Sequence, residues 1–247
     1  MGITLITGAS RGIGAATALL AARSGYDVAI NYMHHREKAE EIAHEIEALG
    51  RRALVVQADV SNPDDVGRLF KTLDKEMGTI QGLVNNAGTL EPQMKFEQME
   101  ADRIGRVIST NIIGTMLCAR ESVRRMSWAN GGQGGAIVNV SSIAAKTGSP
   151  FEYVDYAASK GAIDSFTIGL AKEVAAEGIR VNAVRPGLIY TDIHAQGGEP
   201  GRVDRLKAKI PLGRGGEAEE VAEAIMWLLS DRASFTTGSF IDVAGGL

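Results

Sequence analysis

The sequence ITLITGASRGIG occupies residues 3–14 and joins a short apolar run to a glycine-rich turn. The turn itself, GASRGIG, has three residues and then one residue between its glycines, so it departs from the GxGxxG fingerprint of most dinucleotide-binding folds. The physical requirement is the same. Gly8 lets the chain turn sharply off a strand, Gly12 lets the backbone approach a pyrophosphate, and Gly14 lets the next helix pack close to the sheet.

The segments around the turn predict a nucleotide-binding unit. We expect a strand at residues 3–7, a helix at residues 13–24 and a second strand at residues 27–32. The order strand, glycine turn, helix, strand is that of a mononucleotide-binding unit. A glycine turn without a ligand is the alternative, and the flanking strand and helix disfavour it.

The remaining sequence continues this alternation. Further strands are expected at residues 52–58, 82–85, 136–141, 180–184 and 239–243, and further helices at residues 36–49, from residue 63, and at residues 102–125, 153–176 and 217–230. The sequence therefore predicts an α/β protein with a single-domain Rossmann fold, in which a doubly wound parallel sheet of about seven strands carries helices on both faces.

The composition fits one domain, residues 1–247, with a small-molecule function. Apolar residues make up 45% of the 247 residues and charged residues 23%, which is enough for a full core. A net charge of −4 without a basic patch argues against a nucleic-acid partner. Residues 1–7 do not resemble a signal peptide, no apolar run could span a bilayer, and the single Cys118 cannot form an intrachain disulfide. We expect a cytoplasmic protein with no membrane partner.

The end of the second predicted strand bears on cofactor choice. An NAD site would place an acidic side chain about 20 residues past the glycine turn, to hold the ribose hydroxyls. Asn31 stands there instead, while Arg11 and Ser10 lie in the turn and Arg36 follows the strand. A guanidinium group suits phosphate because its planar fork makes two charge-assisted hydrogen bonds. We predict that NADP(H) is preferred and NAD(H) is possible, unless Arg11 merely faces solvent.

Two other polar groups have structural alternatives. Asp59 follows the third predicted strand, but Asn62 with Pro63 and Asp65 forms a helix-capping pattern beside it, so Asp59 can be structural. The pair His34–His35 has no Cys or acidic partner at ligand spacing, so no metal site is predicted.

Three polar features follow later strands or interrupt a helix. The fourth strand ends in NNAG, residues 85–88, whose amides can tie neighbouring strand ends together. Asn111 lies among β-branched residues inside the expected helix 102–125, either as a satisfied buried amide or as the mark of a bend. The fifth strand ends in Ser141 and Ser142, at the edge of the sheet where ligands collect.

The sequence YAASK, residues 156–160, supplies the chemistry. Residues four apart are neighbours on a helix surface, so the Lys160 ammonium should lie beside the Tyr156 phenol. A cation within about 4 to 6 Å favours the phenolate by about one to three pKa units, which lets a tyrosine exchange protons at working pH. Tyr153 lies two turns from Lys160 and cannot share it in this way.

The same helix and a later loop suggest an assembly surface and a lid. The small residues Ala158, Ala162, Ser165 and Gly169 form a second apolar row on helix 153–176, which predicts burial against another subunit. Residues 188–216 form a long, glycine-punctuated excursion that suits a substrate lid.

The segments TGASRGIG, NNAG, Asn111, the serine pair, YAASK and the PG turn at residues 186–187 together resemble the short-chain dehydrogenase/reductase family over nearly the whole chain. Within that family, EYVDYAASKGAID and GGEPGRVDR look like bacterial glucose or ribitol dehydrogenase-like members. The resemblance implies a nicotinamide-dependent oxidoreductase, commonly a homotetramer, that interconverts a carbonyl and a secondary alcohol on a small molecule, with a sugar or polyol favoured.

The resemblance also implies a role for each matching residue. Tyr156 would be the general acid and base, Lys160 would lower its pKa and hold the nicotinamide ribose, Ser142 rather than Ser141 would bind the substrate oxygen, and Asn111 would support a water that feeds protons to Lys160. The implied cofactor-binding set is Gly8, Ser10, Arg11, Gly12, Ile13, Gly14, Asn31, Asp59, Val60, Asn85, Ala87, Gly88, Tyr156, Lys160, Pro186, Gly187, Ile189 and Thr191.

Two other functions stay open. A 3-oxoacyl thioester reductase would need a basic docking surface for an acidic carrier, to which Arg124 and Arg125 could contribute unless they form a solvated helix face. A scaffold that binds cofactor without catalysis is disfavoured by the intact Tyr156 and Lys160.

Overall fold

Seven parallel strands form the centre of the structure, a computed structural model that describes residues 2–247. They are β1 (Ile3–Ile6), β2 (Asp27–Tyr32), β3 (Ala53–Gln57), β4 (Gly82–Asn85), β5 (Gly135–Val140), β6 (Ile179–Pro186) and β7 (Phe240–Val243). The order in the sheet is β3-β2-β1-β4-β5-β6-β7, and every neighbouring pair is parallel. The strand order reverses between β1 and β4, which is where such sheets bind ligands. The predicted fold class is confirmed.

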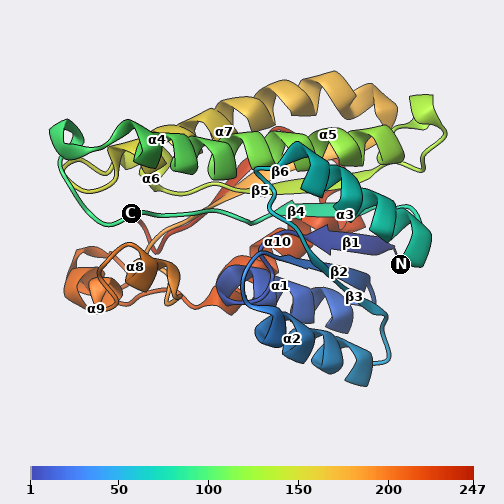
Figure 1. Ribbon diagram of the computed structural model, residues 1–247, viewed down its shortest axis with the longest axis horizontal. Coiled ribbons are helices and arrows are strands. Elements are labelled where there is room, and N and C mark those ends of the chain that lie inside the picture. Colours follow the sequence, from blue (N-terminus) through green and yellow to red (C-terminus); the bar gives the residue numbers. More distant parts are fainter. Residues whose placement is uncertain (1) are drawn as a thin grey trace.

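Helices cover both faces of the sheet (Figure 1). The α-helices are α1 (Gly12–Arg23), α2 (Arg36–Ala48), α3 (Pro63–Glu76), α4 (Ala101–Ile108), α5 (Thr115–Met126), α6 (Ala144–Thr147), α7 (Val154–Val174), α8 (Ile193–Gln196), α9 (Arg202–Leu206) and α10 (Ala218–Leu229). Figure 1 shows α1, α2 and α10 on one face and α3, α4, α5 and α7 on the other. Most of the predicted helix and strand ends lie within two residues of these bounds.

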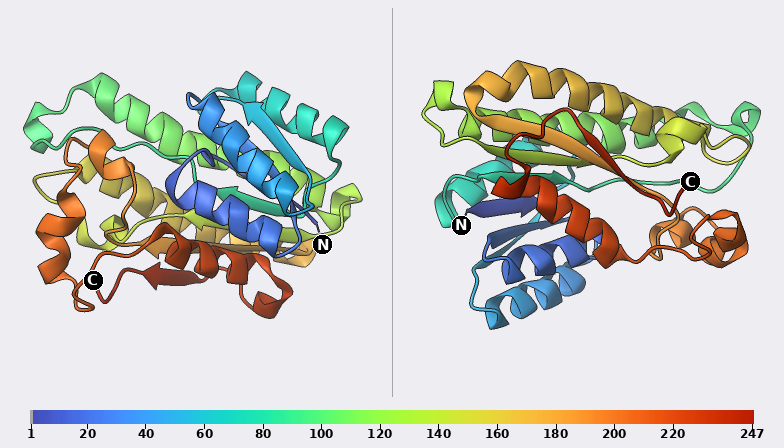
Figure 2. Two further views of the ribbon diagram at one scale, coloured as in Figure 1. Left: turned by 90° about the horizontal axis from the view of Figure 1, so that it is seen from below. Right: turned by 180° about the vertical axis from the view of Figure 1, so that it is seen from behind.

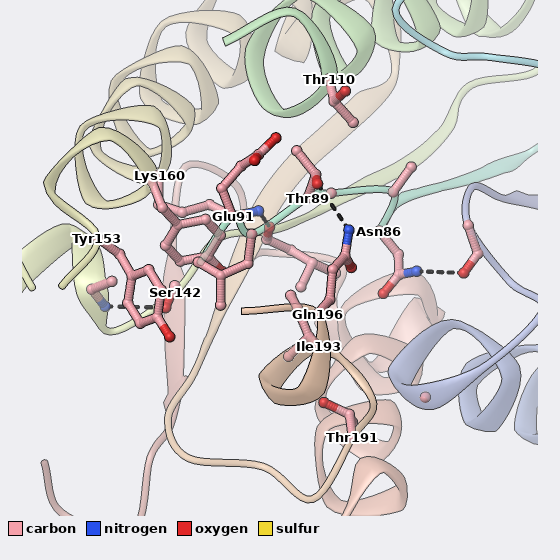
Figure 3. A pocket seen from close by; sticks show the side chains of 18 of the residues that line it. Asn86, Thr89, Glu91, Thr110, Ser142, Tyr153, Lys160, Thr191, Ile193 and Gln196 are labelled. Atoms are coloured by element: carbon pink, nitrogen blue, oxygen red, sulfur yellow. Dashed lines mark hydrogen bonds between the residues drawn. The ribbon is translucent and has the colours of Figure 1, made fainter. Parts of the chain in front are cut away.

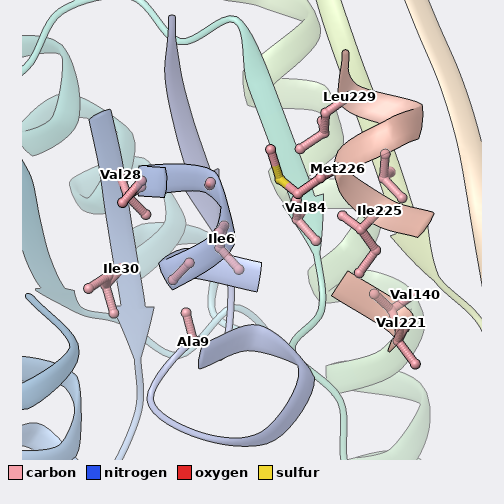
Figure 4. Packing of buried hydrophobic residues seen from close by; sticks show 14 of the residues in the cluster. Ile6, Ala9, Val28, Ile30, Val84, Val140, Val221, Ile225, Met226 and Leu229 are labelled. Atoms are coloured by element: carbon pink, nitrogen blue, oxygen red, sulfur yellow. The ribbon is translucent and has the colours of Figure 1, made fainter. Parts of the chain in front are cut away.

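Each face of the sheet has its own apolar core. On the α10 face, Val221 and Ile225 of the helix pack towards Ile6 and Val84 of the strands (Figure 4). Leu228 and Leu229 of the same helix are also buried. The other face buries Phe70 of α3 against Leu83 and Ile137, among others. These strands are apolar on both sides, as parallel strands covered on both faces must be.

The expected continuous helix at residues 102–125 is wrong in its middle. A π-helical segment, Ser109–Gly114, separates α4 from α5 and contains Asn111. Such segments widen the helix by one residue and often occur at functional sites. Asn111 is fully buried and hydrogen-bonded, so the two interpretations of this residue, a satisfied amide and a marked irregularity, both hold.

The start of α3 shows why Asp59 sits where it does. Asn62 caps the helix by accepting hydrogen bonds from the amides of Asp64 and Asp65, and Pro63 is the first helical residue, as predicted. Asp65 does not complete a capping box with Asn62, however. Its carboxylate accepts from the backbone amide of Asp59 at 2.9 Å. The capping pattern therefore fixes the backbone at the end of the third strand, on the ligand-binding edge of the sheet.

The segment predicted as a lid folds into short helices rather than an open loop. Residues 188–216 contain α8, α9 and a 3-10 turn, Lys207–Lys209, and they lie beyond the carboxyl ends of the strands (Figures 1 and 2). Throughout residues 2–247, no helix combines the length and the apolar character needed to cross a membrane.

Candidate active site

A cavity of about 1210 Å³ opens at the carboxyl ends of the strands. It is lined by most of the predicted site residues, from the glycine turn through the ends of β2, β3, β4 and β5 to α7 and the lid segment (Figure 3). Those residues are Gly8, Ser10, Arg11, Gly12, Ile13, Asn31, Asp59, Val60, Ala87, Gly88, Ser142, Tyr156, Lys160, Pro186, Gly187, Ile189 and Thr191. Gly14, Asn85 and Asn111 lie outside the lining.

The glycine turn leaves the start of α1 open to the cavity. Gly8 and Gly12 both have positive φ angles, 63° and 54°, which the missing side chain permits. Arg11 is the N-cap of α1, and within the described residues its side chain makes no capping hydrogen bond. The first N–H groups of this helix therefore remain as donors for an anion, and the helix dipole favours negative charge there. The turn fits a pyrophosphate.

Gly14 has the packing role that its spacing predicted. A Cβ atom at this position would lie 2.5 Å from Asn86 Nδ2 and 2.6 Å from the Gly8 carbonyl oxygen. Only a glycine lets α1 approach the end of β4 this closely.

Asn31 of the predicted cofactor-binding set lines the cavity, and its side chain is bonded internally. Its Oδ1 accepts a hydrogen bond from the Gly8 amide at 3.2 Å, and its Nδ2 donates to the Ala58 carbonyl at 3.0 Å. The side chain is 2% exposed, so these internal bonds use its polar atoms. Asn31 therefore holds the glycine turn against the end of β3, and its contact with the cofactor stays a prediction.

Asn85 lies outside the cavity lining, which its neighbour Asn86 joins instead. Asn85 points into the core, where it donates to Asn139 at 2.9 Å. Asn86 donates to the carbonyls of Thr7 and Gly8 at 2.9 and 3.0 Å, and its backbone amide donates to Thr7 Oγ1. The NNAG sequence thus ties two strand ends together as predicted, through its second asparagine. The alternation of side chains along a strand sends the first one inward.

Tyr156 and Lys160 line the cavity together with Ser142. Lys160 and Ser142 can be followed in Figure 3. Lys160 Nζ lies 5.5 Å from the centre of the Tyr156 ring and donates to the Val140 carbonyl at 2.7 Å. Ser142 lies close enough to the Tyr156 hydroxyl to lower the pKa of this phenol. The four-residue spacing therefore brings the two groups together on α7.

The expected lowering of the tyrosine pKa is not found in this structure. Burial raises the pKa of Tyr156 to about 12, and the nearby Ser142 side chain only partly opposes this. Burial also lowers the pKa of Lys160 to about 8, against the opposing charge of Asp164. Desolvation outweighs the charge pairing because it penalises the phenolate and the ammonium alike.

The two serines after β5 have different surroundings. Ser141 also lines the cavity, but it is buried and its hydroxyl donates to Asp164 Oδ1 at 2.6 Å. Ser142 lines the cavity, and its Oγ accepts from the Ala144 amide at 3.1 Å. Only Ser142 is next to Tyr156.

Asn111 lies behind these groups and supports the loop after β4. Its Oδ1 accepts from the Thr89 amide at 2.8 Å, and its Nδ2 donates to the Thr89 carbonyl and to Ser159 Oγ. These bonds leave its side-chain amide little capacity to hold a water. A water that passes protons to Lys160 would therefore have to bind the backbone of Asn111 rather than its side chain.

The opposite end of the cavity carries positive charge. Arg11 and Lys38 lie 3.8 and 3.9 Å from the same carboxylate oxygen of Asp192, at the start of α8. Arg36, which was predicted to add a second charge, instead pairs with Glu40 at 2.8 Å and is largely exposed. Lys38, in the first turn of α2, is the additional cation near Arg11.

A salt-bridge cluster holds the lid segment over the tyrosine end. Arg202 of α9 bonds to Glu152 and to Glu199, and its guanidinium lies 5.2 Å from the centre of the Tyr153 ring. Tyr153 donates to the Gly197 carbonyl at 3.1 Å. Tyr153 precedes α7 and contacts the lid, so it is not a second copy of Tyr156.

Two further polar residues at the cavity escaped the sequence interpretation. Gln196 of α8 donates to Thr89 Oγ1 at 3.0 Å and lies 3.5 Å from Arg11, so it spans the cavity from one wall to the other (Figure 3). Glu91 lines the cavity and pairs with Arg106. Nothing in the local pattern of either segment marks these residues.

No group of three or more His, Cys, Asp or Glu side chains arranged to hold a metal ion is found in the part of the chain that the structure describes.

Comparison with known proteins gives consistent matches over almost the whole chain. A family model described as enoyl-(acyl carrier protein) reductase matches residues 8–247. The uncharacterized oxidoreductase YgfF of Escherichia coli (strain K12) is 60% identical over 246 residues, which is 100% of both chains. The 3-oxoacyl-[acyl-carrier-protein] reductase FabG of Staphylococcus aureus (strain Mu50) is 37% identical, over 98% of this chain and 96% of its own.

Two solved structures are similar in fold. A short-chain type dehydrogenase/reductase from Mycobacterium marinum has a TM-score of 0.92 and 34% identity, over 99% of this chain and 94% of its own. A short chain dehydrogenase from Burkholderia cenocepacia J2315, solved in complex with NADP, has a TM-score of 0.89 and 31% identity, over 98% of this chain and 96% of its own.

We predict that Lys160 gives the folding stability a pH dependence that Lys160→Met removes. The folded pKa of about 8 lies below the ordinary 10.5. The unfolded chain therefore binds the proton more tightly, and the parent becomes more stable as the pH rises from about 8 to about 10.5. As the pH rises across this window, the free energy of unfolding of Lys160→Met should fall relative to that of the parent, by at most about 3 kcal/mol.

Urea unfolding of the ligand-free protein on both sides of this window measures the effect. Lys38→Met is the matched control, because the Lys38 side chain is 53% exposed and should add no slope. Identical pH slopes for the parent and Lys160→Met would contradict the prediction.

Proposed function

The chain belongs to the short-chain dehydrogenase/reductase family, and we propose that it is an NADP(H)-dependent oxidoreductase that interconverts a carbonyl and a secondary alcohol on a small polar molecule. One observation carries this proposal. A single cavity joins an anion-binding glycine turn, at the start of α1, to the adjacent Tyr156, Lys160 and Ser142. A dinucleotide and a small substrate need those two groups at opposite ends of one site.

The residues divide the work between binding and proton transfer. A nicotinamide cofactor supplies or accepts the hydride when it is bound. The first amides of α1 hold its pyrophosphate, and Gly12, which lies close to Thr191, keeps the backbone there free of side chain. Lys160 holds the nicotinamide ribose from the other end. Asp59, Val60, Ala87 and Gly88 line the adenosine side.

Proton transfer falls to Tyr156. Its hydroxyl donates to the substrate oxygen as a carbonyl is reduced, and Ser142 orients the same oxygen by a second hydrogen bond. Because burial keeps the phenol protonated, Tyr156 starts the reduction as the acid. Lys160 lies against the ring and can stabilise the phenolate that forms. Its own proton can be renewed through a water held at the backbone near Asn111.

The surroundings of this centre favour a sugar or polyol as the substrate. Glu91, Glu152 and Arg202 line the cavity there and can exchange hydrogen bonds with hydroxyl groups. For the alternative, a 3-oxoacyl thioester reductase, the support is the name of the FabG relative at 37% identity. Arg124 and Arg125 give that alternative little help, since both are paired with acidic side chains. A scaffold without catalysis would have no use for the Tyr156–Ser142 contact.

We predict that turnover depends on the Tyr156 hydroxyl, which Tyr156→Phe removes while keeping the ring. We expect turnover to fall by about a hundredfold or more, since positioned acid–base groups contribute on that scale, while NADPH binding stays within about threefold. Nicotinamide absorbance with a panel of ketones, sugars, polyols and 3-oxoacyl thioesters measures turnover and identifies the substrate class. Tyr153→Phe is the matched control and should keep turnover within about tenfold.

Turnover of Tyr156→Phe within tenfold of the parent would overturn the catalytic assignment. Activity confined to the thioesters would favour the alternative substrate. A parent with no turnover on any member of the panel would favour the scaffold.

We also predict a preference for NADPH over NADH that depends on Arg11. Arg11 and Lys38 lie 3.8 and 3.9 Å from the same Asp192 carboxylate oxygen. A phosphate that replaced this carboxylate would have both cations within reach. A hydrogen bond to a charged group contributes about 1.5 to 3 kcal/mol, which corresponds to about a ten- to hundredfold preference for the phosphorylated ribose. Arg11→Ala should lose most of it. Steady-state efficiency with each cofactor on one substrate gives the ratio.

Arg36→Ala is the control for this measurement, because Arg36 pairs with Glu40 and should leave the ratio unchanged. Equal efficiencies in the parent, or a preference for NADH, would contradict the prediction.

The exposed row on α7 leads us to predict a homotetramer. Ala158, Ser165 and Gly169 are exposed in the single chain, and a Cβ added at Gly169 would meet nothing within 4 Å. Light scattering at micromolar protein should give the mass of a tetramer, and Gly169→Glu should reduce it by placing a charge in the interface. Gly67→Glu on α3, also in open space, should not. A monomeric parent would contradict this prediction.

A further inference from the structure

A buried ion pair next to the active centre has no part in the reaction described above. Arg103 of α4 and Asp155 of α7 have side chains that are 4% and 1% exposed. Arg103 Nε donates to Asp155 Oδ2 at 2.8 Å, and a second guanidinium nitrogen lies 3.4 Å from Oδ1. Neither residue lines the cavity, so neither can touch a substrate or cofactor.

A pair of this kind needs an explanation other than stability. Taking two charges out of water carries a desolvation penalty that their attraction often fails to recover, and apolar residues of similar size usually serve folding as well. The sequence around α7 has abundant apolar residues, yet a full charge pair occupies this point. Retained buried charges can instead fix one arrangement of the parts they join.

The Asp155 carboxylate is bonded to the backbone of the tyrosine that follows it. Its Oδ1 accepts from the Tyr156 amide at 2.9 Å, in the first turn of α7. The N-cap, Tyr153, makes no side-chain capping bond among the described residues, so Asp155 takes over part of that task. A carboxylate at this end of a helix also interacts favourably with the helix dipole.

Arg103 extends the connection to the opposite wall of the cavity. A third guanidinium nitrogen donates to the Pro92 carbonyl. Pro92 belongs to the loop after β4 whose residues Thr89, Leu90 and Glu91 line the cavity. One guanidinium group therefore joins the loop after β4, the helix α4 and the first turn of α7.

We propose that the Arg103–Asp155 pair is a positioning device that sets the Tyr156 hydroxyl against Ser142 and the substrate oxygen. Since this role rests on the proposed function, it applies to turnover and leaves cofactor binding alone. Removal of the pair lets the first turn of α7 shift relative to the cavity wall. A misplacement of about 1 Å in a reacting group can lower the rate by about a hundredfold.

The test replaces both charges at once, so that no unpaired charge stays buried. Arg103→Met/Asp155→Leu fills the same space with apolar groups and is expected to fold. We expect kcat to fall by about ten- to a hundredfold, with KM and the NADPH dissociation constant within about threefold of the parent. NADPH fluorescence gives the dissociation constant independently of turnover.

Two further variants separate positioning from folding. Asp155→Asn keeps one oxygen for the Tyr156 amide but turns its NH2 group towards Arg103 Nε, so it breaks the pair at nearly constant shape and should lower kcat by about tenfold. The control Arg125→Met/Asp74→Leu removes a more exposed pair between α5 and α3, away from the cavity, and should leave kcat unchanged. If the Arg103→Met/Asp155→Leu variant does not fold, the kcat of Arg103→Lys tests the positioning role instead. Its ammonium cannot reproduce the fork that reaches both Asp155 and Pro92, so kcat should fall by about tenfold.

The outcomes distinguish the two levels of the proposal. If the parent is active and the Arg103→Met/Asp155→Leu variant keeps its kcat, the positioning role alone is overturned. If the double variant does not fold, an unchanged kcat in Arg103→Lys overturns it. A parent without turnover on any carbonyl or alcohol would overturn the proposed function and the positioning role with it.

Discussion

The hydrogen bonds between Asn86 and the end of β1 hold the two halves of the sheet together at the point where the strand order reverses. Asn86 Nδ2 donates to the Thr7 and Gly8 carbonyls, and Thr7 Oγ1 accepts from the amides of Asn86 and Ala87. A parallel sheet that reverses its order must leave a gap there, because the two crossover connections leave in opposite directions. The cavity occupies this gap, so the positions of the glycine turn and of the loop after β4 depend on this junction.

The two ends of the cavity work by different physics. At the glycine turn, backbone amides and exposed cations offer positive potential to an anion, with little burial of charge. At the tyrosine end, desolvation dominates and holds Tyr156 protonated and Lys160 partly neutral at moderate pH. This contrast suits a site in which one end binds a charged cofactor tightly and the other moves a proton.

The lid segment contacts both ends through charged and polar side chains. Asp192 and Gln196 of this segment reach Arg11, while Arg202 reaches Glu152 just before α7. Most of these groups are at least partly exposed, so each contact is weak on its own and is screened by salt. Buried apolar side chains such as Val203 and Ile210 also hold the segment, and its role as a substrate lid stays a prediction.

The sequence by itself determined the order of strands and helices, the glycine turn, and the Tyr156–Lys160 pair, since these depend on short-range periodicity and on backbone freedom. It also gave Ser141 and Ser142 as alternatives. Only the tertiary structure showed that the Asn31 and Asn85 side chains form internal hydrogen bonds, because their partners lie far away in sequence. The same holds for the Arg103–Asp155 pair, whose partners are 52 residues apart, and for the raised pKa of Tyr156, which burial decides.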